Sequence, residues 1–215
     1  MEHRMLIPLA ELVKDKRVII IGPGATVKDD CSSIDVDSYD LVCRLNVHWR
    51  LHDGDHKVLG KRTDIIYHCL NENQYTSADL KFWMDNNIKM VSRADIDYLG
   101  PVRKVVTFIK RNENVKYVPE IVPYEFYLDY KTKLGCNPST GTLAIFHLLS
   151  MPLKSLSVAG FDFYQSLYLY RTDDKFLSIV HKMDHNPKKQ LESFKREIAG
   201  FDKFIPIGAL EKLLN

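Results

Sequence analysis

The residues best suited to chemistry in this sequence surround a helix start predicted at Ser139, Thr140 and Gly141. Serine and threonine are common N-cap residues, and the apolar residues that follow predict a helix with Gly141 in its first turn. The N–H groups of a first turn have no partner inside the helix, so they can bind an anion. The segment therefore predicts an anion-binding site.

A short strand follows this helix and ends in polar and aromatic residues. Pro152 stops the helix, and Ser155–Ala159 is typical of a buried strand. Gly160, Asp162 and Tyr164 come directly after that strand. Because ligands of open α/β sheets bind beyond the carboxyl ends of the strands, we expect this strand end to face the same ligand as the helix start.

A histidine occupies a comparable position further along the chain. His185 precedes a helix that is predicted to have Asn186 as its N-cap and Pro187 as its first residue. The backbone holds a histidine at such a place yet leaves it exposed, which suits a general base, although a single loop histidine more often only faces solvent. Residues 165–184 lack clear periodicity, so we expect an irregular segment over the site that carries Tyr170.

Three further strands are predicted to bring polar residues to the same edge of the sheet. Arg17–Ile21 runs into Gly22-Pro23-Gly24, residues 40–45 run into Asn46, and residues 63–68 are followed by Asn71. The glycines fit a loop that passes close to a nucleotide or simply a tight turn, and Val27 breaks the GxGxxG fingerprint. An asparagine at a strand end can pair with a base or a ribose, although it also caps turns.

The remaining elements complete an α/β pattern. Helices are predicted at residues 9–14, 78–86, 124–130 and 209–214, and strands at 88–91, 105–108, 115–118 and 204–207. Four aromatic residues at helical spacing are expected to pack in the core: Tyr124, Phe126, Tyr127 and Tyr130. The expected fold is a single Rossmann-like α/β domain over residues 1–215, with a mostly parallel sheet flanked by helices.

The composition argues against several classes of protein. The 215 residues, 45% of them hydrophobic, can bury the core of one domain. The 30 basic and 28 acidic residues give a net charge of +2 without a long run of either sign, so nucleic acid is not an expected partner. Asp53-Gly54-Asp55 imitates a metal-binding DxD motif, but no hydrophobic strand introduces it, and we do not interpret it as a metal site.

Cysteine usage and hydropathy indicate a compartment. The four cysteines form no CxxC pair, so we expect reduced thiols rather than disulfides or zinc. The N-terminal apolar stretch is too short for a signal peptide, and no later segment approaches the length of a membrane-spanning helix. A soluble cytoplasmic protein of a bacterial or viral type is expected.

The order of these motifs resembles the sialyltransferases of glycosyltransferase families 29 and 42. The glycine turn, residues 40–46 (DLVCRLN), residues 60–63 (GKRT) and residues 138–141 (PSTG) resemble the large and small sialylmotifs of family 29. Residues 160–164 (GFDFY), Tyr170 and His185 resemble the pattern of family 42. The similarity runs from Val18 to the C-terminus.

The resemblance implies a GT-A-like variant of the Rossmann fold and a transfer reaction. A sialic acid or a Kdo-type acid would move from a CMP-sugar donor to a glycan hydroxyl, with inversion and without a metal or another cofactor. The implied catalytic residues are His185, as the base for the acceptor proton, and Tyr164 and Tyr170, as donors to the departing phosphate. The implied nucleotide-binding residues are Gly22, Pro23, Gly24, Asn46, Asn71, Ser139, Thr140, Gly141 and Asp162. The resemblance is also compatible with a homo-oligomer.

Among the departures of the sequence from the family patterns, two concern the proposed site most directly. Asn137 stands where family 42 has an arginine, and Arg44 or Arg171 is the suggested substitute. Gln190 stands where family 29 has the glutamate of a His-x4-Glu motif, with Glu192 beyond it. These departures favour an alternative, a CMP- or glycan-binding module without turnover. A nicotinamide-dependent Rossmann enzyme is disfavoured, because the glycine fingerprint is broken and no acidic residue closes the second strand.

Overall fold

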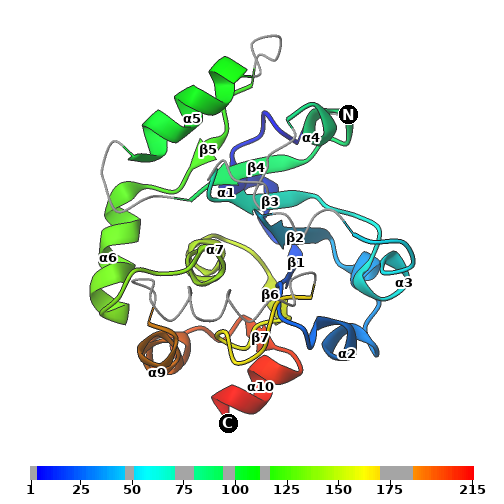
Figure 1. Cartoon of the computed structure of the whole chain (residues 1–215), viewed down its shortest axis with the longest axis vertical. Helices are drawn as coiled ribbons and strands as arrows, with labels where there is room; N and C mark the ends of the chain where they lie inside the picture. The colour runs from blue at the N-terminus through cyan, green and yellow to red at the C-terminus, as the bar shows by residue number, and fades with distance from the viewer. Residues whose placement is uncertain (1–3, 47–50, 71–79, 94–99, 112–116, 170–185) are drawn as a thin grey trace.

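The computed structural model describes residues 4–46, 51–70, 80–93, 100–111, 117–169 and 186–215. Within these residues, seven strands form one sheet in the order β5-β4-β3-β2-β1-β6-β7, and every neighbouring pair is parallel (Figure 1). The strands are β1 (Arg17–Ile21), β2 (Leu41–Leu45), β3 (Ile65–His68), β4 (Lys89–Ser92), β5 (Glu120–Ile121), β6 (Ser155–Ala159) and β7 (Phe204–Pro206). This sheet confirms the predicted fold class.

Helices cover both faces of the sheet. They are α1 (Leu9–Leu12), α2 (Val27–Cys31), η1 (Val36–Ser38), α3 (His56–Leu59), α4 (Leu80–Asp85), α5 (Gly100–Arg111), α6 (Tyr124–Leu134), α7 (Thr140–Leu149), α9 (Pro187–Ile198) and α10 (Ala209–Leu214). Val18 and Ile20 of β1 pack in the cluster that contains α6, α7 and α9, whereas Ile19 and Ile21 pack against α2 and α3. Both faces of β1 are therefore buried, which explains its uninterrupted apolar sequence.

The strand order places a topological switch between β1 and β6. From β1 the chain adds β2, β3, β4 and β5 on one side, and it then returns to add β6 and β7 on the other. Ile21 is in register with Arg44 of β2 and with Ala159 of β6, so the three strands end at nearly the same level. Ligands of open α/β sheets bind at such a switch, so the residues that follow these strands are candidates for a site.

Most predicted elements are confirmed, one predicted strand is wrong, and a second is absent from the part of it that the structure describes. β1, β6 and α10 occupy the predicted residues, and α9 begins at Pro187 after its predicted N-cap. Residues 105–108 lie inside α5, where Val105 and Phe108 are buried and Val106 is exposed, which is the spacing of a helix face. The strand predicted at 115–118 lies partly outside the described residues; its described part, 117–118, is not a strand, and β5 begins at Glu120.

The aromatic residues of α6 pack as predicted. Tyr127 and Tyr130 are buried in the largest hydrophobic cluster, and Tyr124 and Phe126 pack against it. Tyr130 stacks on Phe146 of α7 with ring centroids 4.3 Å apart. Among the described residues, no helix is both long enough and apolar enough to cross a membrane.

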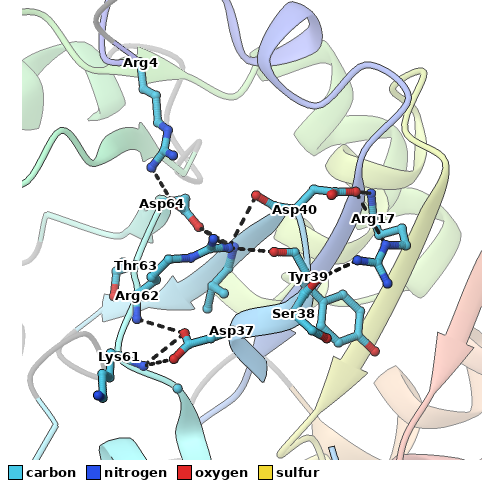
Figure 2. A network of polar contacts seen from close by, with 12 residues as sticks. Arg4, Arg17, Asp37, Ser38, Tyr39, Asp40, Lys61, Arg62, Thr63 and Asp64 are labelled. Carbon is cyan, nitrogen blue, oxygen red and sulfur yellow. Dashed lines mark hydrogen bonds and ion pairs between the residues drawn. The ribbon is translucent and has the colours of Figure 1, made fainter. Parts of the chain in front are cut away.

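Charged residues tie together the amino ends of β2 and β3 (Figure 2). Asp64, which is 1% exposed, accepts a hydrogen bond from the N–H of Val42 at 2.8 Å and forms ion pairs with Arg4 and Arg62. Asp37 accepts a hydrogen bond from the N–H of Arg62 at 3.2 Å. The segment at residues 60–64 therefore stabilises the amino ends of these strands, opposite the strand ends at which the switch lies.

Candidate functional site

Helix α7 begins as predicted, with Ser139 as its N-cap. The Ser139 hydroxyl accepts a hydrogen bond from the N–H of Thr142 at 3.1 Å. All ten residues of α7 are buried, so packing on every side fixes the helix. The N–H groups of Thr140 and Gly141 lie in the first turn, where the helix itself provides no acceptor. This first turn is therefore suited to bind an anion.

The ring of Phe161 holds the start of α7 against two strand ends. A Cβ atom at Gly141 would lie 2.5 Å from this ring and 3.1 Å from the Cδ1 of Leu45, the last residue of β2. A Cβ atom at Gly22, which follows β1, would overlap with the same ring. The two glycines thus leave room for Phe161 between β1, β2 and α7. They have a packing role that neither sequence motif indicated.

The turn after β1 pairs with the segment that follows β6. Gly22 donates a hydrogen bond to the last carbonyl of β6 at 2.8 Å, and Gly24 donates to the Gly160 carbonyl at 2.9 Å. The Pro23 carbonyl accepts from the N–H of Leu169 at 2.8 Å. These bonds agree with the simpler interpretation of the glycines as a tight turn. Nucleotide binding by residues 22–24 stays a prediction.

Tyr164 reaches the start of α7 from a strained turn. Phe163 and Tyr164 have φ angles of 52° and 63°, a conformation that costs non-glycine residues about 1–3 kcal/mol each. The Tyr164 hydroxyl is hydrogen-bonded to Ser139 and Tyr168. Burial of this hydroxyl raises the pKa of Tyr164, although both hydrogen bonds and the charge of Arg93 oppose the rise. The phenol is therefore protonated at neutral pH and can donate to a bound anion.

The side chains of Asn46 and Asp162 hold turns in place at the carboxyl ends of the strands. Asn46 directly follows β2 with a φ angle of 48°, and its Oδ1 accepts a hydrogen bond from the N–H of Cys69, beyond β3, at 3.0 Å. Asp162 is 8% exposed and accepts from the N–H of Ser166 at 2.8 Å. Both side chains thus have a structural partner, and their contact with a nucleotide stays a prediction.

Gln190 joins α9 to the start of α7. Its side chain is nearly fully buried; its Nε2 donates to the Asn137 carbonyl at 3.2 Å, and its Oε1 accepts from the Thr142 hydroxyl at 2.6 Å. An amide can donate and accept at once, whereas an ionised glutamate can only accept. The departure from the family-29 glutamate therefore has a structural reason.

The guanidinium that family 42 places at position 137 does not come from Arg44. The Asn137 Oδ1 accepts from the Tyr127 hydroxyl at 2.9 Å, which turns this amide toward α6. Arg44 is 0% exposed, and its Nη2 donates to the carbonyls of Leu59 at 2.6 Å and Gly60 at 3.0 Å. The suggested substitution by Arg44 is wrong, because backbone carbonyls enclose its guanidinium.

Another arginine, which no sequence motif singled out, lies beside α7. Arg93 directly follows β4, and its N–H donates to the His68 carbonyl at 3.1 Å. Its half-buried guanidinium donates from Nη1 to the Thr140 hydroxyl at 3.4 Å. The only signal in the sequence is a basic residue next to a predicted buried strand. Which other element it reaches cannot be read from that signal.

Several predicted residues lie outside the described part of the chain. They are Asn71, Tyr170, Arg171 and His185, and their roles stay predictions. In the part of the chain that the structure describes, no group of three His, Cys, Asp or Glu side chains is arranged to hold a metal ion. The four cysteines, all described, are free thiols.

The arrangement of helices on both faces of a parallel sheet, with a switch beside its central strand, defines the doubly wound class of α/β folds. Within that class, the chain has the fold of the sialyltransferases. A mammalian sialyltransferase in complex with Gal-beta-1-3GalNAc-ortho-nitrophenol is 14% identical, with a TM-score of 0.59 over 92% of this chain and 71% of that one. No protein-family model and no curated protein sequence matches the chain.

Two bacterial structures show the same similarity of fold. The sialyltransferase CstII from Campylobacter jejuni, in complex with the substrate analogue CMP-3FNeuAc, is 18% identical, with a TM-score of 0.56 over 89% of this chain and 81% of that one. The monofunctional alpha-2,3-sialyltransferase Cst-I from the same organism is 14% identical, with a TM-score of 0.56 over 96% and 79% of the two chains.

Proposed function

We propose that this protein transfers sialic acid, or a Kdo-type acid, from a CMP-sugar donor to a hydroxyl of a glycan. The observation that carries the proposal is the Tyr164 hydroxyl beside the N-terminus of α7, at the switch point of a sialyltransferase fold. A protonated phenol and a helix N-terminus are both suited to bind a phosphate. CstII, which shares this fold, has been solved with CMP-3FNeuAc, and this supports CMP as the nucleotide.

In the proposed reaction, His185 takes the proton of the acceptor hydroxyl while the hydroxyl oxygen forms a bond to the anomeric carbon of the donor. The bond from that carbon to the CMP phosphate breaks with inversion, and CMP departs as an anion. Tyr164 and Tyr170 donate hydrogen bonds to this phosphate, and the first turn of α7 stabilises its charge. The residues proposed to bind the nucleotide are Gly22, Pro23, Gly24, Asn46, Asn71, Ser139, Thr140, Gly141 and Asp162. The reaction is proposed to need no metal, because these groups face a single phosphate.

A second candidate function is the binding of CMP or a glycan without turnover. It is favoured by Asn137, whose amide is engaged by Tyr127 where family 42 has an arginine. A binding module needs no general base, so the proposed role of His185 separates the two functions.

Ligand binding and turnover test the two candidates in turn. Thermal unfolding with CMP, UDP and NAD comes first, since a ligand of the native state raises the Tm by mass action. We expect stabilisation by CMP, and stabilisation by NAD alone would contradict both candidates. Hydrolysis of CMP-sialic acid and of CMP-Kdo then measures turnover and identifies the donor. Turnover that His185→Ala abolishes while CMP still raises the Tm supports the enzyme, whereas CMP binding without turnover in the wild type supports the binding module.

A further inference from the structure

Two side chains reach the first turn of α7 from different parts of the sheet. Tyr164, beyond β6, is hydrogen-bonded to Ser139, and Arg93, beyond β4, reaches the Thr140 hydroxyl at 3.4 Å. In the sheet, β3, β2 and β1 lie between β4 and β6, so the two side chains approach the helix from opposite directions. The turn therefore has a neutral donor on one side and a permanent positive charge on the other.

The position of Arg93 favours an anion beside the helix start. A guanidinium and a helix N-terminus carry charge of the same sign, so an anion that contacts both relieves their repulsion. The 3.4 Å contact with Thr140 is at the long end of hydrogen bonding, so this contact is weak. Nη1 can therefore exchange this one contact for a stronger, charge-assisted contact when an anion binds.

The donor of the proposed reaction has two anionic groups close together, the phosphate of CMP and the carboxylate on the anomeric carbon of the sugar. Tyr164 is assigned to the phosphate in the proposed function. Asn137 and Arg44 are engaged elsewhere, by the Tyr127 hydroxyl and by backbone carbonyls. Arg93 is the arginine that the structure places at the remaining side of the same turn.

We propose that Arg93 binds the carboxylate of the donor sugar. This assignment rests on the proposed function and names the group that selects the class of donor. The planar fork of a guanidinium matches a carboxylate with two parallel hydrogen bonds, which a neutral hexose cannot accept in the same way. Sialic acid and Kdo both carry the carboxylate, so Arg93 selects 2-keto acid sugars as a class rather than one of them.

The test compares CMP with CMP-3FNeuAc, two ligands that share the nucleotide and differ by the carboxylate-bearing sugar. Calorimetry gives the affinity of both for the wild type, Arg93→Gln and Arg93→Lys. We expect Arg93→Gln to weaken CMP-3FNeuAc on the order of 10- to 100-fold and to leave CMP nearly unchanged. Arg93→Lys should lie between, because an ammonium keeps the charge but loses the fork.

The control is Arg196→Gln, which removes the same charge from the exposed surface of α9 and should change neither affinity. An equal loss of both ligands in Arg93→Gln would overturn the proposal, because it would place Arg93 on the nucleotide. Unchanged affinity for both would overturn it as well, without touching the proposed function. If the wild type binds neither ligand, the proposed function fails and the assignment of Arg93 fails with it. Should Arg93→Gln unfold, the affinities of Arg93→Lys and the wild type for the two ligands distinguish the same outcomes.

Discussion

At the scale of single residues, Tyr164 shows how local strain and packing place a functional group. Phe163 and Tyr164 both have positive φ angles. Proteins retain such strained conformations where contacts with the surrounding residues hold the backbone in place. Phe163 supplies that constraint, because its buried ring contacts Phe194 of α9 with centroids 5.1 Å apart. Burial of such a ring contributes about 1.5–3 kcal/mol, which is comparable to the strain. The buried neighbour thus holds the turn that presents the Tyr164 hydroxyl.

Tyr164→Phe removes this hydroxyl and keeps the ring. If the phenol donates to the leaving phosphate, kcat for hydrolysis of the CMP donor should fall roughly 100- to 1,000-fold, the usual loss for one donor to a developing oxyanion. The free energy of unfolding should change by only about 1 kcal/mol, because one hydrogen-bonding group is lost. Tyr39→Phe is the matched control, since it removes a phenol that donates to the Ser157 hydroxyl at 3.0 Å. Equal kcat values in the two variants would contradict a role for Tyr164 in the reaction.

At the scale of elements, two neighbours fix the start of α7. Phe161, beyond β6, fills the space that Gly22 and Gly141 leave open, and Gln190 of α9 bonds to Asn137 and Thr142. The candidate site therefore depends on packing contacts between β1, β2, β6, α7 and α9, in addition to the residues proposed to contact the ligand. Substitutions at these contacts should act first on stability and on the geometry of the helix start.

Gly141→Ala tests the contact with Phe161. The new Cβ would lie 2.5 Å from the ring, so ring or helix must move, and the free energy of unfolding should fall by about 1–3 kcal/mol in urea titrations. Gly200→Ala is the matched control, because its nearest atom is 3.9 Å away and its stability should be equal or slightly higher. Adding Phe161→Leu to Gly141→Ala should recover part of the loss. A loss no larger than in the control would show that the helix start is loosely packed.

Gln190→Glu tests the link between α9 and α7. The ionised carboxylate cannot donate to the Asn137 carbonyl, so at pH 7 the variant should be less stable than the wild type by about 1–3 kcal/mol. Burial disfavours the charged form and raises the pKa of a carboxyl group, so the difference from the wild type should shrink as the pH falls to about 5 and the group regains a proton. Urea titrations at both pH values measure this difference. Gln165→Glu, at an exposed position, should show neither effect.

The elements that were predicted from sequence are those whose pattern allows one interpretation. β1 has apolar residues without interruption and a glycine turn, and α9 has an N-cap followed by proline. The prediction for α5 was wrong, because the β-branched residues 105–107 and the aromatic Phe108 suit a strand as well as one turn of a helix. The helical choice becomes visible only when Val105 and Phe108 are seen to be buried while Val102 and Val106 face solvent.

At the scale of the whole molecule, the charged network and the candidate site lie at opposite ends of the strands. Charged side chains around Asp64 connect the amino ends of β2 and β3 (Figure 2). Left-handed non-glycine residues occur at both ends of the strands: Asn46, Leu70 and Tyr164 follow β2, β3 and β6, and Asp15 and Asn87 precede β1 and β4. The candidate site around Ser139 and Tyr164 lies at the carboxyl ends of the strands, so the charged network around Asp64 is at the opposite end of the strands from the candidate site.

The sequence predicts some residues of the candidate site and misses others, because a motif contains information only about its own helix or strand. Ser139 and Tyr164 were predicted from separate motifs, and they meet because α7 begins and β6 ends at the same end of the sheet. Arg44 and Arg171 were suggested in place of the family-42 arginine, and Arg93, which no motif contains, was not. The direction of each guanidinium depends on packing between elements, and that information is absent from any local pattern.

His147 is expected to make the stability of the whole molecule depend on pH. Its ring is 5% exposed, and its Nδ1 lies 2.8 Å from the Tyr67 hydroxyl in the core between α7 and β3. Burial lowers the pKa of His147 from 6.5 to about 4, and the charge of Glu120 opposes this only in part. As the pH falls below 6.5 the unfolded chain takes up a proton that the folded protein excludes. Stability is thus present above that pH and is lost progressively toward about pH 4.

Between about pH 7 and pH 5, the loss from this one group amounts to about 2 kcal/mol of unfolding free energy. Urea titrations at both pH values on the wild type and on His147→Gln isolate it, because the other histidines contribute equally to both proteins. The glutamine can still accept from Tyr67, so the variant should fold, and its stability should change less with pH by about this amount. The same pH dependence in both proteins would mean that His147 titrates alike in the folded and unfolded chain, and that the core tolerates its charge.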